Sequence, residues 1–225
     1  KVKILLGVSS GEWKAMIADE AARTTFAKNI KTVLEKNKLD GIDLDFEWAE
    51  NEKEYKDYSL AILKMREVLG NKYLFSVSLH PVCYKISKEA IEAVDFISLQ
   101  CYGPSPVRFP IEKYCSDIQM VLEYGIPKEK LVAGVPFYGV TKDNSKKTEA
   151  YFNFVQNGLV TSPAQNEVIY QGDTYVFDGQ DNIRIKTRYA KEQKLKGMMS
   201  WDLATDLPLS DSRSLLKTMT EELRE

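Results

Sequence analysis

The sequence has very little histidine and cysteine, which excludes several kinds of catalytic site. His80 is the only histidine, so sites that need two or more histidine ligands, such as the HExxH zinc site, are excluded. A Ser-His-Asp triad would have to use His80, which directly precedes Pro81. The three cysteines have no CxxC spacing, and we expect them to be buried or free thiols: Cys83, Cys101 and Cys115.

The sequence also lacks a charge excess and a long apolar run. Its 31 basic and 33 acidic residues give no reason to expect nucleic acid or an anionic membrane as the main partner. No run approaches the ~18 apolar residues that span a bilayer. No signal peptide is visible, although one already removed would leave the same sequence. The length of 225 residues fits one large domain.

Short apolar runs typical of strands alternate with longer segments of helical periodicity. The predicted strands are 3–8, 41–46, 73–79, 96–100, 131–136 and 197–201. A less regular region, 141–182, contains a short helix at 151–156 and a hairpin at 168–177. This alternation predicts a parallel sheet, as a doubly wound sheet or a (β/α)₈ barrel. No GxGxxG or GxxxxGK[ST] motif follows a strand, which disfavours the nucleotide-binding versions.

The most informative segment is 40–48, which reads DGIDLDFEW. Because alternate side chains of a strand share a face, Asp43, Asp45 and Glu47 point one way and the apolar residues between them point the other way. Three carboxylates inside a barrel raise one another's pKa and titrate as a set. A carboxylic acid that stays protonated near neutral pH suits a general acid. An exposed acidic edge strand and a divalent-cation site are the alternatives.

With this segment the sequence resembles glycoside hydrolase family 18, the chitinases and endo-β-N-acetylglucosaminidases. The family motif DGxDxDxE is met in full by Asp40, Gly41, Asp43, Asp45 and Glu47. Four more segments resemble barrel strands of the family in the expected order, the third, sixth, seventh and eighth: 3–13, 94–103, 131–140 and 197–206.

The resemblance implies a (β/α)₈ TIM barrel of which residues 1–225 supply strands three to eight as a single catalytic domain. The first two βα units would then be absent, and six strands alone would leave two bare edges. We therefore expect a fragment, with a self-contained six-stranded variant as the alternative. The insertion domain that some members carry between strands seven and eight is expected to be absent, which implies an open, endo-type groove.

The resemblance also implies the catalytic roles. Glu47 matches the general acid that protonates the glycosidic oxygen. Asp45 matches the acid that hydrogen-bonds the N-acetyl group, and Asp43 matches its buried partner. Tyr102 matches the tyrosine that steadies the cyclic intermediate, and Trp201 the ring under the sugar at the cleavage subsite. Because the acetamido oxygen of the substrate is the nucleophile in this family, one acid suffices and no cofactor or metal is implied.

Two segments depart from the family pattern. The family often reads Met-x-Tyr-Asp on strand six, where this chain has Gln100, Cys101, Tyr102 and Gly103. Gly103 replaces an aspartate that usually touches the substrate, and Gln100 could supply amide contacts instead. The SxGG turn is altered to SSGE at 9–12. The acid residues are unaffected.

Four further residues have two interpretations each. We assign Tyr138 to the substrate site, with packing as the alternative, and Trp13 to the same site with packing equally open. His80 either faces the cleft or has a structural role. Trp48 is expected to pack against Glu47 and shield it.

The expected function is that of a retaining, substrate-assisted glycosidase acting on β-1,4-linked N-acetylglucosamine glycans. Chitin, peptidoglycan and the core of an N-glycan stay open as substrates. A non-catalytic sugar-binding protein and a metal-dependent barrel enzyme are the alternatives. Non-catalytic relatives usually lose the acid that this chain keeps as Glu47. By family analogy the protein is secreted, periplasmic or on the cell surface.

Overall fold

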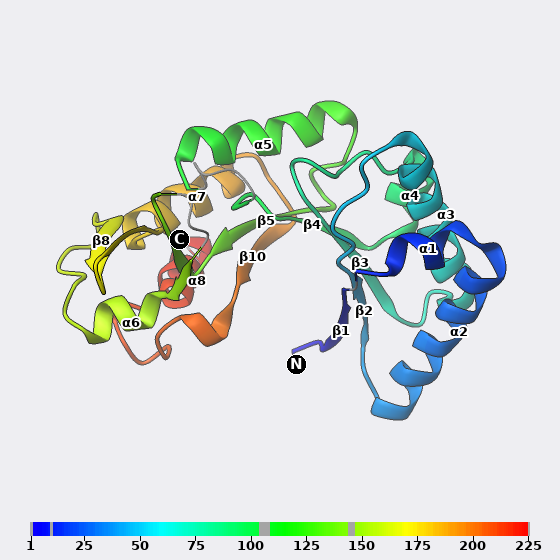
Figure 1. Cartoon of the computed structure of the whole chain (residues 1–225), viewed down its shortest axis with the longest axis horizontal. Helices are drawn as coiled ribbons and strands as arrows, with labels where there is room; N and C mark the ends of the chain where they lie inside the picture. The colour runs from blue at the N-terminus through cyan, green and yellow to red at the C-terminus, as the bar shows by residue number, and fades with distance from the viewer. Residues whose placement is uncertain (1, 10, 104–108, 144–146, 225) are drawn as a thin grey trace. The chain divides into compact units, whose positions relative to one another are not determined.

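The computed structural model describes residues 2–9, 11–103, 109–143 and 147–224. Within it the chain forms two compact units, which are described separately (Figure 1). The first unit comprises the residues up to 99 together with 121–131, and the second comprises 100–120 and 132–225.

The first unit is built on four parallel strands, each paired with the next along the chain. They are β1 (Leu5–Val8), β2 (Gly41–Leu44), β3 (Leu74–Leu79) and β4 (Phe96–Leu99). The register places Asp43 of β2 beside Ser76 of β3. The four strands predicted here are confirmed, although β2 ends two residues earlier than the expected 41–46.

Four helices connect and cover these strands: α1 (Trp13–Ala18), α2 (Glu20–Asn37), α3 (Glu52–Leu69) and α4 (Lys88–Ala93). Three of them begin at a side chain that accepts a backbone N–H bond and so satisfies a donor left open by the first turn. These caps are Asp19, Asn51 and Ser87, at 2.7, 3.0 and 3.2 Å. Helix α1, a helix of six residues, was not predicted from the sequence.

The second unit contains a parallel pair of strands, β5 (Leu131–Pro136) and β10 (Gly197–Trp201), both at the predicted bounds. Helices α5 (Ile111–Tyr124), α7 (Gln180–Glu192) and α8 (Leu215–Arg224) and the short η1 (Leu203–Thr205) complete it, with the end of α5 lying in the first unit. None of the helices in the described ranges is long and apolar enough to cross a membrane.

An antiparallel sheet lies between β5 and α7, in the order β7-β6-β9-β8. Its elements are β6 (Tyr138–Thr141), β7 (Thr148–Ala150), α6 (Tyr151–Gln156), β8 (Glu167–Tyr170) and β9 (Asp173–Val176). The predicted hairpin is confirmed as β8–β9 and the predicted short helix as α6. The segment from β6 to β9, hereafter the insert, also pairs β6 with β7 and β9, so it forms a four-stranded sheet where the sequence predicted only the hairpin and the helix.

The pairing of β6 with β7 and β9 was not predicted, because it depends on contacts that span the whole segment. Strand β6 pairs with both β7 and β9, which lie on opposite sides of α6 in the sequence. Gly139 allows the ring of Phe154 to approach the sheet, since a Cβ at this glycine would lie 2.7 Å from that ring.

Candidate active site

The acidic segment 40–48 contains β2 and continues beyond the end of this strand in the first unit. The backbone N–H of Asp45 donates to the carbonyl of Val8 at 2.9 Å, so pairing with β1 continues one residue beyond the strand. The apolar residues of the segment are buried: Ile42, Leu44 and Phe46 are 0, 0 and 2 % exposed. Asp43 and Asp45 are half-buried, and Glu47 is exposed. The predicted alternation of buried apolar and accessible acidic side chains is therefore present.

Asp43 is held by two serines of the neighbouring strand. Ser76 donates its hydroxyl to Oδ1 of Asp43 at 2.5 Å, and Ser78 donates to Oδ2 at 2.7 Å. Burial raises the pKa of the Asp43 carboxyl, and the two serine hydrogen bonds oppose that rise. Sequence reasoning missed both serines, although their alternate positions in β3 place them on one face.

Tyr58 of α3 packs behind the same strand. It is fully buried, and its hydroxyl donates to the carbonyl of Leu44 at 3.3 Å. Burial raises the pKa of Tyr58 well above its ordinary value, and the charges of Asp43 and Asp45 add to the effect. The ring therefore stays neutral and supports β2 from the apolar side.

The structure corrects the assignment of Trp13 to the substrate site. This residue is 2 % exposed, and its ring stacks on Phe46 with centroids 5.0 Å apart and an interplanar angle of 11°. Its indole N–H donates to the backbone carbonyl of Glu47 at 3.3 Å. A ring buried on this scale offers no face to a sugar, so Trp13 is a packing residue that supports the backbone of the candidate acid.

His80 and Cys83 pack against the residues that directly follow Glu47. His80 is 3 % exposed, and its Nδ1 accepts the backbone N–H of Val82 at 3.3 Å. The ring of Trp48 lies 5.1 Å from that of His80. Cys83 Sγ accepts the N–H of Ala49 at 3.2 Å. The indole N–H of Trp48 is buried without a hydrogen-bond partner among the described residues.

The remaining candidates lie in the second unit. Tyr102, 6 % exposed, meets Tyr138 edge to face at 6.3 Å, and Tyr138 meets Phe109 in the same way at 6.3 Å. The Tyr102 hydroxyl lies 3.9 Å from Sδ of Met199 on β10. We call these four residues, Tyr102, Phe109, Tyr138 and Met199, the aromatic cluster. Phe109 and Met199 carried no signal in the sequence, because apolar residues of this kind are ordinary core.

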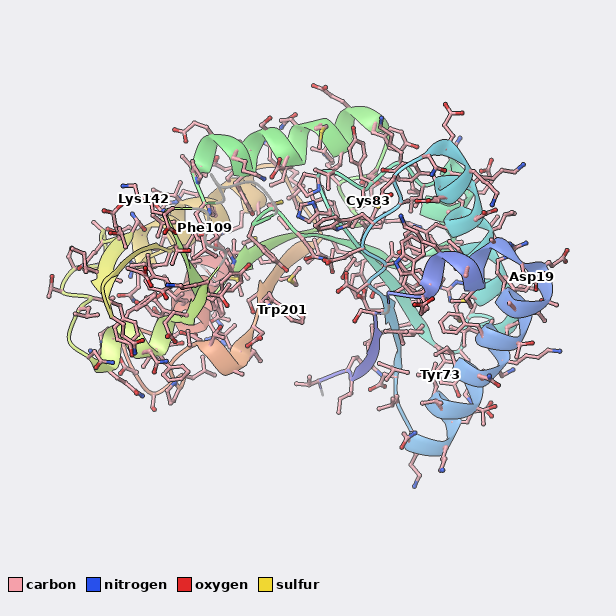
Figure 2. The ribbon with its side chains drawn as sticks, viewed as in Figure 1. Asp19, Tyr73, Cys83, Phe109, Lys142 and Trp201 are labelled. Atoms are coloured by element: carbon pink, nitrogen blue, oxygen red, sulfur yellow. The ribbon has the colours of Figure 1, made fainter. Side chains whose placement is uncertain are left out.

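Gln100 and Trp201 differ in their accessibility. Gln100 follows β4 and is 9 % exposed, whereas Trp201 ends β10 and is 55 % exposed (Figure 2). Trp201 and Met199 occupy alternate positions of β10 and so share a face. Of the altered turn at 9–12, Ser10 lies outside the described residues. The ranges that the structure describes contain no group of three or more His, Cys, Asp or Glu side chains able to hold a metal ion.

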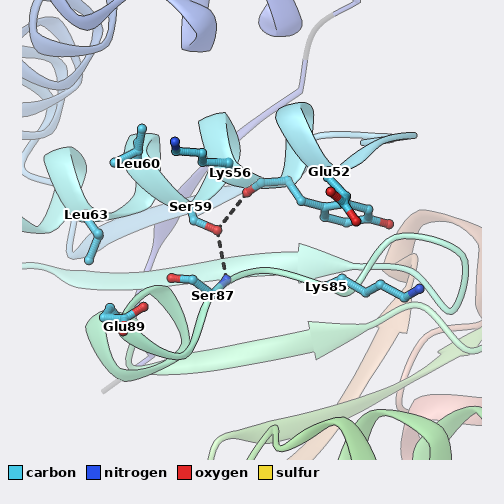
Figure 3. Close-up of a pocket in the computed structure, with 9 residues that line it drawn as sticks. Glu52, Lys56, Ser59, Leu60, Leu63, Lys85, Ser87 and Glu89 are labelled. Atoms are coloured by element: carbon cyan, nitrogen blue, oxygen red, sulfur yellow. Dashed lines mark hydrogen bonds between the residues drawn. The ribbon is translucent and has the colours of Figure 1, made fainter.

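A separate hollow of about 450 Å³ lies between α3 and the segment that leads into α4 (Figure 3). Ser59 closes its floor by donating to the carbonyl of Tyr55 at 2.8 Å and accepting the N–H of Ser87 at 2.9 Å. The residues that line it include none of the predicted site residues: Glu52, Tyr55, Lys56, Ser59, Leu60, Leu63, Lys85, Ser87 and Glu89.

Comparison with known proteins decides the family. The profile of Glycosyl hydrolases family 18 matches residues 1–206. The chain belongs to this family. A curated family 18 relative, "Probable chitinase 2" of Drosophila melanogaster, is 23 % identical over 273 residues, which cover 92 % of this chain and 56 % of the relative. The chain spans about half the length of the first curated relatives that it matches, 56 and 41 %.

Solved structures of family 18 proteins show the same fold. A chitinase from Bacteroides thetaiotaomicron superposes with a TM-score of 0.87 at 22 % identity, covering 98 % of this chain and 76 % of that one. A mutant class V chitinase from Nicotiana tobaccum in complex with NAG4 has a TM-score of 0.82 at 17 % identity, covering 98 and 80 %. The predicted fold class is confirmed as a curled parallel sheet that forms part of a (β/α)₈ barrel.

Proposed function

We propose that the protein is a retaining, substrate-assisted glycosidase that hydrolyses β-1,4-linked N-acetylglucosamine glycans, with chitin as the first candidate substrate. The observation that carries the proposal is the complete DGxDxDxE motif. Its apolar residues are buried, whereas Asp43 and Asp45 are half-buried and Glu47 is exposed. The names of the matched curated relatives, which are chitinases, support chitin, although the matched structures include a chitinase-like agglutinin and YKL-39 beside the chitinases.

The proposed reaction has two steps. The acetamido oxygen of the sugar attacks the anomeric carbon, the glycosidic bond breaks, and Glu47 gives its proton to the departing oxygen. Water then opens the cyclic intermediate and returns a proton to Glu47. The configuration at the anomeric carbon is retained because two displacements occur.

The other residues position the reacting groups. Asp45 accepts the N–H of the acetamide and directs its oxygen to the anomeric carbon. Asp43, which Ser76 and Ser78 hold and whose pKa burial raises, is the buried partner of Asp45 in this proposal. Tyr102 steadies the cyclic intermediate. Trp201, with an exposed ring, supplies a platform under the sugar.

The test is hydrolysis of a chromogenic chitobioside by the full-length protein, with and without EDTA. We expect turnover that EDTA leaves unchanged and that a thiazoline analogue of the cyclic intermediate inhibits. Covalent labelling of a carboxylate by a fluoro-sugar would contradict substrate assistance, and loss of turnover with EDTA would favour a metal-dependent enzyme. Saccharide binding without turnover would indicate a non-catalytic sugar-binding protein.

The finer substrate assignment needs a second experiment. A panel of chitin, peptidoglycan and N-glycan substrates, with product sizes measured, separates the three glycan classes and distinguishes endo from exo cleavage. We expect chitin oligomers to be cut fastest. Gly103 and Gln100, where the family pattern changes, are the residues at which we expect that preference to be set.

By family analogy we expect the protein to act outside the cytoplasm.

A further inference from the structure

A lysine and an aspartate form an ion pair inside the second unit. Nζ of Lys186 lies 2.5 Å from Oδ2 of Asp178, and the two side chains are 2 and 0 % exposed. Asn182 donates its amide to the other carboxylate oxygen at 3.2 Å. Removing two charges from water often costs more than their attraction returns, and a well-packed apolar pair is often as stable. The pair therefore requires an explanation other than stability.

The ammonium of Lys186 also contacts two aromatic rings. Its Nζ lies 5.6 Å from the ring centroid of Tyr114 and 6.0 Å from that of Phe109. Asp178 follows the insert, Lys186 belongs to α7, and the two rings lie at the start of α5. A desolvated cation is attracted strongly to ring faces. One charged group thus joins the end of the insert, α7 and the start of α5.

Phe109 connects this charged group to the aromatic cluster. Its ring meets Tyr138 at an interplanar angle of 83°, and Tyr138 meets Tyr102 at 87°. Phe109 and Tyr102 are only 5 and 6 % exposed. Close-packed interiors contain few voids, so a ring that shifts displaces its neighbours.

We propose that the Asp178–Lys186 pair is a positioning device for Tyr102. The aspartate fixes the ammonium, the ammonium fixes Phe109, and Phe109 fixes the orientation of Tyr138 and Tyr102. The catalytic consequence rests on the proposed function, in which Tyr102 steadies the intermediate. An apolar pair would fill the same space without the attraction to the ring of Phe109. The fold would therefore persist, but the orientation of the Tyr102 side chain would be less restricted.

The test compares the wild type with the double variant Asp178→Leu, Lys186→Met, which leaves neither charge buried alone. Residue 102 is replaced by 3-fluorotyrosine in each protein, and its ¹⁹F resonance reports the position of the ring. We expect the double variant to unfold within a few degrees of the wild type but to show a shifted or broadened resonance. On a chitooligosaccharide we expect kcat to fall about tenfold, equivalent to ~1.4 kcal/mol, with a smaller change in KM.

A matched control removes an exposed ion pair from the same helix. Asp181 and Arg184 pair at 2.6 Å with side chains 45 and 39 % exposed. The variant Asp181→Leu, Arg184→Met should leave the resonance of residue 102 and kcat unchanged. A double variant at the buried pair that also leaves both unchanged would overturn the proposal.

Phe109→Leu keeps the ion pair and removes the ring that transmits its position. We expect this variant to shift the same ¹⁹F resonance. It therefore tests the positioning of Tyr102 even if the double variant does not fold. An unchanged resonance would refute the positioning role. A wild type without glycosidase activity would count against the proposed function, whereas the resonance would still test the positioning of Tyr102.

Discussion

Glu47, the proposed general acid, is accessible to a substrate and has a supported backbone. Its side chain is exposed just beyond β2, and its backbone carbonyl is held by the indole of Trp13. The neighbouring acids differ in environment, since Asp43 is enclosed by two serines whereas Glu47 is accessible. Such a difference in environment is what could give neighbouring carboxylates the separate roles that we propose for them.

Glu47→Gln should abolish nearly all turnover while saccharide binding persists. The amide keeps the size and much of the hydrogen bonding but has no proton to give, and loss of a general acid costs roughly 10²-fold or more in rate. Rates on a chromogenic chitobioside, with binding measured by calorimetry, check this. Glu50→Gln is the matched control, because Glu50 is exposed and pairs with Lys14, and it should retain full activity. A Glu47→Gln protein with more than a tenth of the wild-type rate would exclude this assignment.

Asp43 should make the unfolding free energy depend on pH. Because burial raises its pKa in the folded state, the folded protein binds more protons than the unfolded chain above the usual Asp pKa of about 3.9. The stability contributed by this group is therefore present at low pH and is lost as the pH rises through the raised pKa. Urea unfolding across a pH series should show a smaller decline for Asp43→Asn than for the wild type. Equal slopes would mean that Asp43 titrates normally.

At the scale of elements, the approach of β2 to β3 depends on a glycine. A Cβ on Gly41 would lie 2.1 Å from the carbonyl oxygen of Leu74, which is backbone and cannot move aside. A Cβ on Gly7 of β1, in contrast, would have no atom of the described residues within 4 Å. The two glycines lie on adjacent strands and so provide a direct comparison.

Gly41→Ala should destabilise the protein by about 1–3 kcal/mol, because overpacking forces the backbone apart. Gly7→Ala should change the unfolding free energy much less. Denaturant unfolding of both variants measures the difference. Similar values for the two substitutions would show that the β2–β3 spacing is not limiting.

At the scale of residues 1–225 as a whole, β1 presents an exposed apolar border in the part of the chain that the structure describes. Among the described strands β1 pairs with β2 alone, and Val2 and Ile4, which lead into β1, are 84 and 61 % exposed. Unpaired strand edges with apolar side chains are templates for association with other chains.

In a protein made of residues 1–225 alone, Ile4→Lys should therefore reduce self-association. A charge beside an open strand edge opposes edge-to-edge pairing of two chains. Light scattering over a concentration series measures the effect. Val33→Lys is the control, since Val33 is an exposed apolar residue on helix α2 (38 %) and makes no strand edge. An equal improvement from both substitutions would indicate a general solubility effect of added charge.

The sequence by itself determined the strands of the barrel and the orientation of its acids. Alternation along 40–48 is a local property, because a strand places successive side chains on opposite faces whatever surrounds it. The crossover helices likewise predicted parallel pairing, which the register of β1 to β4 confirms. The bounds predicted for the strands at 131–136 and 197–201 agree with the structure, because a short apolar run is likewise a local property of the sequence.

Only the tertiary structure decided which side chains meet across elements. The serine that holds Asp43 is 33 residues away in the sequence, and the carbonyl that Trp13 binds is 34 residues away. A tryptophan beside a strand end reads equally well as a sugar platform or as core, and its stacking on Phe46 settled the matter. The buried pair of Asp178 and Lys186 likewise gave no signal, since only packing shows that a charge in an amphipathic helix faces inward.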